Sequence, residues 1–395
     1  MQKIAIIGGG AAGMMAAATL AEKGGVEIFL LEKNEELGKK VKISGGGRCN
    51  VTTGITDVGE VLKKYPRGAK FLRAAMYDFP PKAVFDWFEA QGVALKVEKD
   101  LRVFPQSNRG EDVVTVFERI FAEKDVKVMF GVDVSAVERR GERFVVNGLE
   151  VDKVVLTMGG QAYRHTGSEG DGYGIAESLG HRITDLGPSL NAFMVRDEWV
   201  KRLAGVSFAD VRLRMNDAEF RGPMLMTHRG VTGPAVFALS SLTAFSKFSA
   251  SAPADLRLDF WPDESYESLG KRVAALVASG GRKTFVTACG ALGPKSLLKE
   301  LLGETGERFA AEVGKKDVNK LVELLKNCAV AVVGRLPGEE FVTAGGVDTA
   351  EVDPATMESR ICPGLFFAGE ILNVDGFTGG YNLQAAWAMG RKLGS

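Results

Sequence analysis

Near its amino terminus the sequence reads Lys3-Ile-Ala-Ile-Ile-Gly-Gly-Gly-Ala-Ala-Gly13, a short apolar run that stops at three glycines. The apolar run is typical of a buried parallel strand, and the alanine-rich segment 11–23 that follows has the composition of a helix. A strand, a glycine turn and a helix in this order form the start of a nucleotide-binding unit. We therefore expect an α/β fold built around a parallel sheet.

The three glycines of Gly8-x-Gly10-x-x-Gly13 each have a steric reason. Gly8 allows a tight turn, Gly10 lets a pyrophosphate approach the backbone, and Gly13 lets the helix pack close to the strand. The helix N-terminus offers free N–H groups and the positive end of its dipole to the phosphates. A second apolar run ends in Glu32, the acidic residue expected to hold the ribose hydroxyls. This pattern predicts a dinucleotide site without distinguishing NAD from FAD, and a plain strand-to-helix turn is the alternative.

Composition limits the classes of protein to which the chain can belong. Its 395 residues suggest two or three domains, and 45% of them are hydrophobic, which is enough for a sizeable core. Lys plus Arg and Asp plus Glu both number 50, so no overall charge attracts nucleic acid or an anionic membrane. We therefore expect a small-molecule substrate rather than a nucleic-acid or membrane partner, and the oligomeric state stays open.

The spacing of cysteines and histidines argues against a metal site. The chain has four cysteines and three histidines, which are Cys49, Cys289, Cys328, Cys362, His165, His181 and His228. None of the cysteines form a Cys-x-x-Cys pair, and the seven residues do not have the spacing of metal ligands. Reduced thiols are the simpler interpretation. The amino terminus lacks a basic lead and a cleavage site, and no window reaches the roughly 20 apolar residues of a membrane span. A cytoplasmic protein is expected.

A second glycine-rich stretch supports the dinucleotide prediction. It reads Ser44-Gly-Gly-Gly-Arg-Cys-Asn50, at the end of a predicted loop that also carries Lys39, Lys40 and Lys42. Glycines permit close backbone approach, and the cations oppose phosphate charge. A solvated flexible loop is the alternative. Cys49 is interpreted as a small packing residue, with a reactive thiol near Arg48 as the other interpretation.

Side chains suited to a substrate site follow the predicted strands. One buried strand stops at Gly159-Gly160, and the polar, glycine-rich segment 163–174 comes next. Loops at the carboxyl ends of parallel strands are where doubly wound proteins place ligands. Tyr163 and His165 are therefore candidates for the substrate side, as is Arg102 in a predicted hairpin. A surface role is the alternative for a lone loop histidine.

The pattern changes near Pro188. Runs in the manner of antiparallel strands occupy 206–215, 219–226 and 256–261. Helical segments broken by glycines then fill 266–326, and strand-like runs return after them. This order predicts a sheet domain that is interrupted by a small helical domain.

The end of the chain resembles its beginning. A buried strand ends at Gly369-Glu370, and a glycine pair in Thr378-Gly-Gly-Tyr-Asn382 opens an alanine-rich helix that reaches about Leu393. This helix again points free N–H groups at a place where glycines permit close approach. An ordinary terminal strand and helix would not require such a junction, so we expect a ligand-binding turn here.

With both ends taken together, the sequence resembles the BaiN-like, aminoacetone-oxidase-like FAD-binding flavoproteins of the two-dinucleotide-binding-domain clan. The resemblance covers the chain from end to end, and the second and last matching stretches are highly specific. These stretches are Ile6-Gly-Gly-Gly-Ala-Ala-Gly13, Leu37-Gly-Lys-Lys-Val-Lys-Ile-Ser-Gly-Gly-Gly-Arg-Cys-Asn50, Arg102-Val-Phe-Pro-Gln-Ser107, Thr343-Ala-Gly-Gly-Val347 and Gly369-Glu-Ile-Leu-Asn-Val-Asp-Gly-Phe-Thr-Gly-Gly-Tyr-Asn-Leu-Gln384. One departure is Asn373, where relatives often carry an aspartate.

The resemblance implies FAD as the cofactor and a fold with three parts. A discontinuous Rossmann-like FAD-binding domain would comprise 1–190 and 345–395. A β-barrel-like domain would be inserted at 191–262 and 328–344. A small helical domain would occupy 263–327.

The resemblance also assigns cofactor-binding residues along the chain. The pyrophosphate would meet Gly8, Gly10, Ala11, Ala12 and Gly13; the adenosine ribose would meet Glu32 and Lys33; and backbone near Val134 would face adenine. The residues that line the dinucleotide would be Lys40, Gly46, Gly47, Arg48, Cys49 and Asn50. The pocket would be closed by Met158, Gly159 and Gly160, with Gly369 and Glu370 on the ribityl side. The isoalloxazine would lie against Gly380, Tyr381, Asn382 and Leu383.

The family has no single agreed reaction, so the activity stays open at this point. Members resemble reductases of enone-type steroid thioesters or oxidases of small amines. We predict hydride transfer between a small organic substrate and flavin, with NAD(P)H or oxygen as the second partner. A second strand-Gly-x-Gly-x-x-Gly-helix unit is missing from the middle of the sequence, so NAD(P)H would dock transiently or another donor would serve. The alternatives are an amine oxidase, an RNA-modifying flavoprotein and a non-catalytic FAD-binding module.

Overall fold

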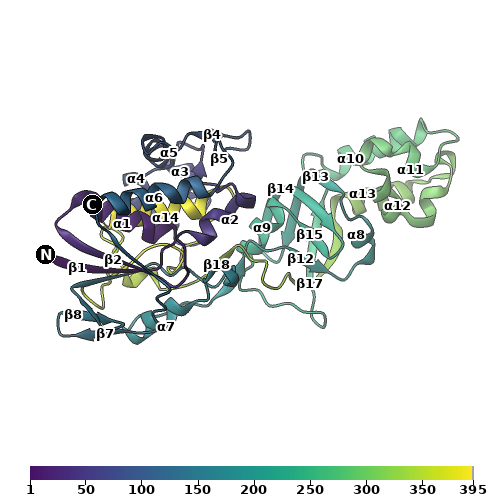
Figure 1. Cartoon of the computed structure of the whole chain (residues 1–395). Helices are drawn as coiled ribbons and strands as arrows, with labels where there is room; N and C mark the ends of the chain where they lie inside the picture. Colours follow the sequence, from purple (N-terminus) through teal and green to yellow (C-terminus); the bar gives the residue numbers. More distant parts are fainter. Residues whose placement is uncertain (394–395) are drawn as a thin grey trace. The chain divides into compact units, whose positions relative to one another are not determined.

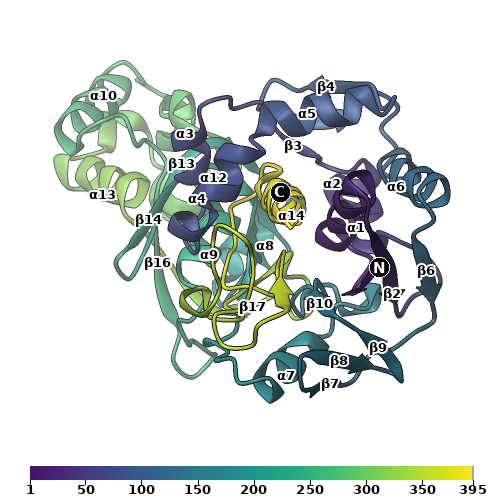
Figure 2. The same ribbon diagram turned by 90° about the vertical axis from the view of Figure 1, so that its left-hand side faces the viewer.

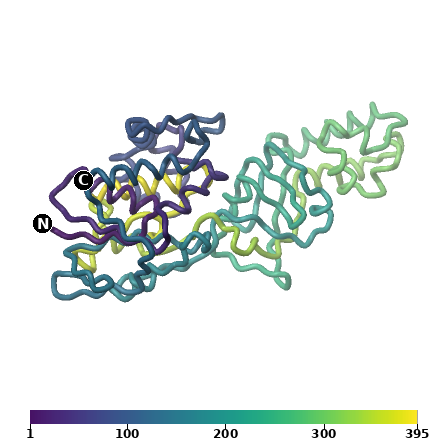
Figure 3. The backbone as a smooth tube through the Cα atoms, in the orientation of Figure 1, coloured from purple at the N-terminus to yellow at the C-terminus, as the bar shows by residue number. Residues whose placement is uncertain are grey.

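The computed structural model describes residues 1–393 of the chain, which divides into two compact units. Unit 1 comprises Met1–Ser189 and Glu340–Ser395, and unit 2 comprises Leu190–Glu339. The backbone trace in Figure 3 shows the purple start and the yellow end of the chain together in unit 1. Unit 2 is thus an insertion in the chain of unit 1. The three-part division expected from the sequence stays a prediction.

A five-stranded parallel sheet forms the centre of unit 1. Its strand order is β19-β10-β1-β2-β6, and every neighbouring pair runs parallel. Strand β1 lies in the middle, where its apolar run from Ile4 to Ile7 is buried on both faces. Figure 1 labels β1 and β2, and Figure 2 labels β6 and β10. The five strands are β1 (Gln2–Ile7), β2 (Val26–Glu32), β6 (Lys127–Phe130), β10 (Lys153–Leu156) and β19 (Leu365–Phe367).

Helices surround this sheet, and the first and last of them pack directly against one another. Gly390 of α14 permits the contact, since a Cβ there would lie 2.6 Å from Ala12 O of α1. Figure 2 shows α14, in yellow, between α1 and α4. The helices of unit 1 are α1 (Ala11–Lys23), α2 (Lys39–Gly47), α3 (Val58–Leu62), α4 (Ala69–Asp78), α5 (Pro81–Ala90), α6 (Glu111–Glu123), α7 (Asp171–Ser178) and α14 (Tyr381–Lys392).

Small antiparallel sheets complete unit 1. One of them pairs β11 with β18, the strands along which the chain leaves unit 1 and returns to it. A second sheet has the order β3-β5-β4, and a third has the order β7-β8-β9. Their strands are β3 (Thr52–Thr53), β4 (Leu95–Val97), β5 (Arg102–Pro105), β7 (Val137–Arg140), β8 (Arg143–Val146), β9 (Leu149–Val151), β11 (Gly187–Ser189) and β18 (Val342–Ala344).

Unit 2 is a closed antiparallel barrel whose core continues into a group of helices. The strand order around the barrel is β12-β15-β14-β13-β16-β17. One buried apolar cluster includes both barrel and helix side chains. The strands are β12 (Phe193–Val195), β13 (Ser207–Met215), β14 (Ala218–Thr227), β15 (Gly230–Thr232), β16 (Ala254–Asp259) and β17 (Cys328–Arg335). The helices are α8 (Glu198–Arg202), α9 (Pro234–Leu242), α10 (Tyr266–Ala278), α11 (Phe285–Ala288), α12 (Lys295–Leu302) and α13 (Lys315–Lys326).

The fold class predicted from the sequence is confirmed, because the chain combines a Rossmann-like parallel sheet, a closed barrel and helices. One local prediction was wrong. The lysine-rich stretch after Leu37, expected to be a loop, begins with a turn of helix from Lys39. Lysine, valine and isoleucine permit this turn, and the helical conformation is lost at Ser44, whose ψ is 150°.

Candidate functional site

The first glycine turn joins β1 to α1, and the structure explains each of its three glycines. Gly8 has a φ of 105°, and a Cβ there would lie 2.7 Å from Thr157 O. A Cβ on Gly13 would lie 1.9 Å from Gly8 O, so α1 packs on this turn only without a side chain. A Cβ on Gly10 would meet nothing within 4 Å. The turn is therefore closely packed at Gly8 and Gly13 and open at Gly10, as a phosphate-binding turn requires.

Charged side chains lie beside this turn, where β2 ends. Glu32 is 8% exposed, and its Oε2 accepts the N–H of Gly9 at 2.7 Å. Lys33 Nζ lies 2.7 Å from Asp171, the first residue of α7. The N–H of Val132 donates to Glu32 O at 3.0 Å, which brings the segment that carries the buried Val134 close to β2. The residues assigned to the adenosine end therefore lie together.

A second glycine turn ends α2. Gly45 and Gly46 have left-handed φ/ψ angles of 59°/28° and 73°/38°, and Gly47 has a φ of 85°. Cβ atoms on Gly46 and Gly47 would meet nothing within 4 Å, whereas one on Gly45 would lie 2.8 Å from the Phe104 ring. Turns of this kind expose neighbouring backbone N–H groups that bind anions. Gly46 and Gly47 therefore leave room for a ligand.

The residues after this turn have different surroundings. The Arg48 guanidinium lies 3.8 Å from the centroid of the Phe104 ring and 2.7 Å from Glu98. Cys49 is fully buried, and burial raises the pKa of its thiol to about 12. The thiol therefore stays protonated at neutral pH, which favours the packing role of Cys49 over the reactive one.

The loop after β19 contacts both the first turn of α1 and α2. Gly369 has a φ of 86°, and a Cβ there would lie 2.9 Å from the Ala12 side chain. Glu370 Oε2 accepts from Lys40 Nζ at 2.6 Å. Gly160, which follows β10, approaches the same carboxylate, since a Cβ there would lie 2.9 Å from Glu370 Oε1. Residues from four separate stretches thus meet at the carboxyl end of the sheet.

The turn before α14 contacts the end of the second glycine stretch. Gly380 has a φ of 87°, and a Cβ there would lie 2.3 Å from Thr52 O. With the Asn50 amide in the orientation that its neighbours satisfy, its Oδ1 accepts the N–H of Gly380 at 2.8 Å. Asn382 closes the preceding loop, because its Nδ2 donates to Gly376 O and its Oδ1 accepts from Gly376 N, both at 2.8 Å. The two glycine motifs therefore lie side by side.

The remaining cofactor candidates line the same region. Gly159 has a φ of 75°, and Met158 packs against Gly172 at the start of α7. Tyr381 is 8% exposed, whereas Leu383 is half-buried. Ala11 and Ala12 form the first turn of α1. These positions are compatible with the roles assigned from the sequence, which stay predictions.

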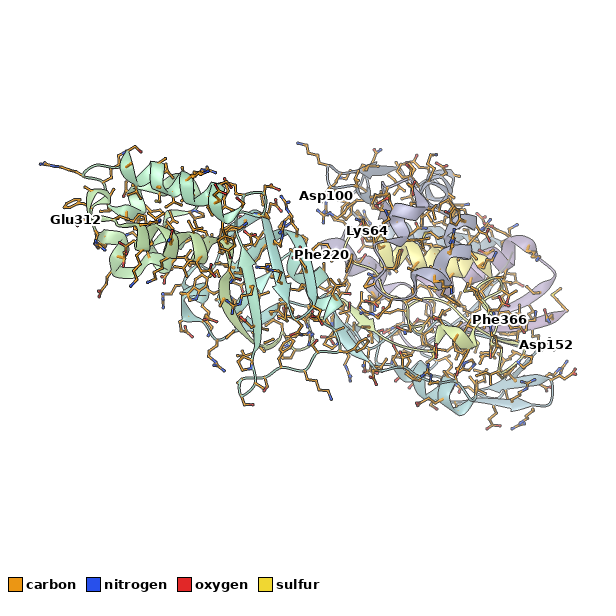
Figure 4. The ribbon with its side chains drawn as sticks, turned by 180° about the vertical axis from the view of Figure 1, so that it is seen from behind. Lys64, Asp100, Asp152, Phe220, Glu312 and Phe366 are labelled. Carbon is orange, nitrogen blue, oxygen red and sulfur yellow. The ribbon has the colours of Figure 1, made fainter. Side chains whose placement is uncertain are left out.

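The candidates for the substrate side fall into two groups. Tyr163 and His165 lie together, with ring centroids 5.6 Å apart, and Tyr163 stacks on Phe341 at 5.8 Å. Arg102 lies on β5, where it pairs with Asp100 at 2.8 Å and with Glu98 at 3.7 Å. Asp100 is labelled in Figure 4, at the tip of the β4–β5 hairpin. The structure therefore places Arg102 with Arg48, which shares Glu98.

One feature of this region is not predicted from the sequence, namely the ion pair between Arg67 and Asp375. Arg67 Nη2 donates to Asp375 Oδ2 at 2.5 Å, and the Asp375 side chain is fully buried. Asp375 lies in the last matching stretch of the sequence, which was a usable signal. Arg67 lies in a segment with no motif, so its partner could not be foreseen.

Two further observations concern residues 1–393. Among the helices described for them, none has the length and apolar composition that crossing a bilayer requires. Over the same residues, His, Cys, Asp and Glu side chains do not gather into a group of three that could hold a metal ion.

Comparisons with known proteins place these features in context. The family described as HI0933-like protein Rossmann domain matches residues 2–395. A 3-dehydro-bile acid delta(4,6)-reductase from Clostridium scindens is 31% identical over 407 residues, covering 100% of this chain and 98% of that protein. A ribosomal RNA dihydrouridine synthase from Escherichia coli is 31% identical over 396 residues, covering 97% of this chain and 94% of that protein.

Solved structures show the same fold. The 3-ketosteroid-delta4-(5alpha)-dehydrogenase from Rhodococcus jostii RHA1 superimposes with a TM-score of 0.52 at 16% identity, covering 100% of this chain and 96% of that one. At this identity the likeness concerns the fold alone.

Proposed function

This chain belongs to the HI0933-like Rossmann family, and from that premise we propose that it is an FAD-dependent reductase of a carbon–carbon double bond conjugated with a carbonyl group. The bile-acid reductase and the dihydrouridine synthase have different substrates, but their names describe the same bond change. The bile-acid reductase reduces double bonds that are conjugated with a 3-oxo group. The dihydrouridine synthase saturates the ring double bond that is conjugated with a carbonyl group of uracil. Their common chemistry supports this reaction class.

The observation that carries the proposal is that three glycine turns meet at the carboxyl end of the parallel sheet. They are the turn before α1, the turn that ends α2 and the turn before α14. The contacts that join them are Gly369–Ala12, Lys40–Glu370 and Asn50–Gly380. The phosphates of a dinucleotide accept hydrogen bonds from backbone N–H groups, and they can approach those groups only where no side chain is in the way. Gly10, Gly46 and Gly47 supply open positions of this kind. The residues present therefore fit FAD, and we propose that those named from the sequence hold it.

The proposed reaction adds one hydride and one proton across the double bond, and it oxidises one NAD(P)H to NAD(P)⁺. FAD, when bound, supplies the reversible uptake of the hydride. We propose that the adjacent Tyr163 and His165 supply the proton and that Arg102 binds the polar end of the substrate. The N-terminus of α14 favours negative charge at the turn that precedes it. Transient docking of NAD(P)H accounts for the missing second glycine motif.

The decisive experiment starts from the absorbance spectrum of the purified protein, which should show bound flavin. Anaerobic mixing with NADH or NADPH should bleach the flavin, and a 3-oxo-4,6-diene steroid should then restore its colour faster than oxygen does. Fast reoxidation by oxygen, together with bleaching by aminoacetone, would support the amine oxidase instead. A protein that is colourless and cannot be reconstituted with FAD would overturn the proposal.

A second candidate function is the reduction of a uracil base within RNA. The specific observation is a basic segment, 61–77, with an exposed tyrosine and no Asp or Glu. Apart from Arg67, which is paired with the buried Asp375, its cations are Lys63, Lys64, Lys70 and Arg73. Lys70, Arg73 and Tyr77 are exposed on α4. Cations and aromatic rings are what single-stranded RNA binds. Faster reoxidation of the reduced flavin by unmodified ribosomal RNA than by the steroid would favour this candidate.

A further inference from the structure

A short segment, 64–68, runs alongside the loop 373–380 that precedes α14. The N–H of Phe377 donates to Lys64 O at 2.9 Å, and Arg67 forms an isolated antiparallel bridge with Asp375. Lys64 is labelled in Figure 4. The contact is close, because a Cβ on Gly68 would lie 2.9 Å from Asn373 O. Backbone contacts therefore hold this loop at several points along its length.

Side chains reinforce the contact through a buried ion pair. Arg67 approaches Asp375 with two nitrogens, since Nη2 donates to Oδ2 at 2.5 Å and Nε donates to Oδ1. Ser189 Oγ donates to the same Oδ2 at 2.9 Å. The Asp375 side chain is 0% exposed and that of Arg67 is 15% exposed. A carboxylate taken out of water is tolerated only with such partners, so this position requires the guanidinium.

A tyrosine links the same segment to the first residue of α14. Tyr65 Oη donates to Tyr381 O at 2.6 Å, and the two rings meet edge to face with centroids 6.2 Å apart. A Cβ on Gly376 would lie 3.0 Å from the Tyr65 ring, so the loop folds directly onto it. The start of α14 is thus fixed from the side of 64–68 as well as by Asn50.

We infer that Arg67 is a positioning residue for the flavin site, acting through Asp375 on the loop that leads into α14. The inference rests on the proposed function, in which Gly380 and the residues after it lie on the ring side of FAD. The guanidinium fixes the loop and balances the charge of Asp375. Without it, the negative charge of Asp375 is no longer balanced by the guanidinium and disfavours the uptake of electrons by the flavin, because the reduced ring gains negative charge.

The test compares variants that separate charge from geometry. Arg67→Met removes the cation, Arg67→Lys keeps the charge but loses the two-nitrogen contact, and the double variant Arg67→Met/Asp375→Asn restores neutrality. Lys326→Met is a matched control, because Lys326 forms a buried ion pair with Asp259 in unit 2, at 2.7 Å. For each protein, the flavin midpoint potential, the dissociation constant of FAD from the apoprotein and the melting temperature of the apoprotein are measured.

Arg67→Met should make the midpoint potential more negative and weaken FAD binding by about tenfold or more, as expected for a buried charge that has lost its partner. The double variant should bring the potential back toward that of the wild type. Arg67→Lys should leave the flavin midpoint potential close to that of the wild type and should raise the dissociation constant of FAD. Lys326→Met should lower the melting temperature of the apoprotein and leave the flavin potential unchanged.

A purely structural role for Arg67 predicts something different. In that case Arg67→Met would lower the melting temperature of the apoprotein, as Lys326→Met does, but the FAD that it still binds would have the wild-type midpoint potential. That result would overturn the inference. If Arg67→Met does not fold, Asp375→Asn answers the question, because removing the negative charge should shift the potential in the positive direction. Failure of the wild-type protein to bind FAD would instead overturn the proposed function, so the two failures are distinguishable.

Discussion

Asn50 and Gly380 lie at opposite ends of the sequence and, with the Asn50 amide in the orientation that its neighbours favour, are joined by a hydrogen bond of 2.8 Å, in which the amide oxygen accepts the backbone N–H of Gly380. The Asn50 amide also donates to Thr52 O at 3.2 Å. Gly380 has no space for a side chain on this side, since a Cβ would lie 2.3 Å from Thr52 O. The second glycine turn and the start of α14 are therefore coupled through one side chain.

Replacing that side chain should weaken cofactor binding. In Asn50→Ala the N–H of Gly380 loses its partner, at a cost of about 1–3 kcal/mol, and the start of α14 is no longer fixed. We expect the dissociation constant of FAD, measured by quenching of flavin fluorescence on titration of the apoprotein, to rise about tenfold. Asn327→Ala in unit 2 is the control and should leave this constant unchanged. An unaltered constant in Asn50→Ala would show that the coupling has no part in binding.

Two glycines of the first turn should respond differently to the same substitution. Gly10→Ala adds a methyl group where nothing lies within 4 Å, so the apoprotein should keep its melting temperature while FAD binding weakens. Gly13→Ala places its methyl group 1.9 Å from Gly8 O, so α1 must shift and the apoprotein should be destabilised. Thermal melting of the apoproteins and FAD titration distinguish the two. Equal loss of stability in both variants would contradict the assignment of Gly10 to a ligand.

These contrasts show what the sequence can and cannot predict. The spacing of Gly8, Gly10 and Gly13 predicts a strand, a turn and a helix because each step is local, and the structure has them. The residue pattern alone predicted antiparallel strands, and a barrel was implied only by the family resemblance, since closure depends on the pairing of β12 with β17, which are distant in sequence. The same limit applies to Arg67, whose role depends on a partner that local patterns do not indicate.

The Cys49 prediction illustrates a second limit. The sequence placed a thiol next to Arg48, which suits either a reactive thiolate or a packing residue. Only burial decides between them, and burial follows from contacts between segments far apart in the chain. The structure encloses Cys49 completely and stacks Arg48 on Phe104 instead.

The four cysteines should resist thiol-specific reagents in the folded protein. All four are buried, and burial raises the pKa of Cys49 and Cys328 to about 12 and that of Cys289 to about 11. Because the thiolate is the reactive form, a thiol reagent such as Ellman's reagent should titrate almost no thiol at pH 8 without denaturant. In guanidinium chloride all four should react. Rapid reaction of one thiol in the native protein would show that its enclosure opens readily.

His181 is buried between two hydrogen-bonding partners. Its Nε2 lies 2.8 Å from Ser359 Oγ and its Nδ1 lies 3.1 Å from Glu351 Oε2. Burial lowers the pKa of His181 below its ordinary value of 6.5, and the Glu351 carboxylate opposes that shift only in part. The neutral imidazole is therefore the form that the folded protein favours.

The sign of the resulting pH dependence follows from this direction. As the pH falls below about 6.5, the unfolded chain binds a proton at His181 while the folded protein does not, so the free energy of unfolding decreases. We expect the apparent melting temperature to fall between pH 7.5 and 5.5 by more in the wild type than in His181→Asn. His228→Asn, which changes an exposed histidine, should behave as the wild type does. A fall that is equal or larger in His181→Asn would mean that the buried imidazole does not control stability in this pH range.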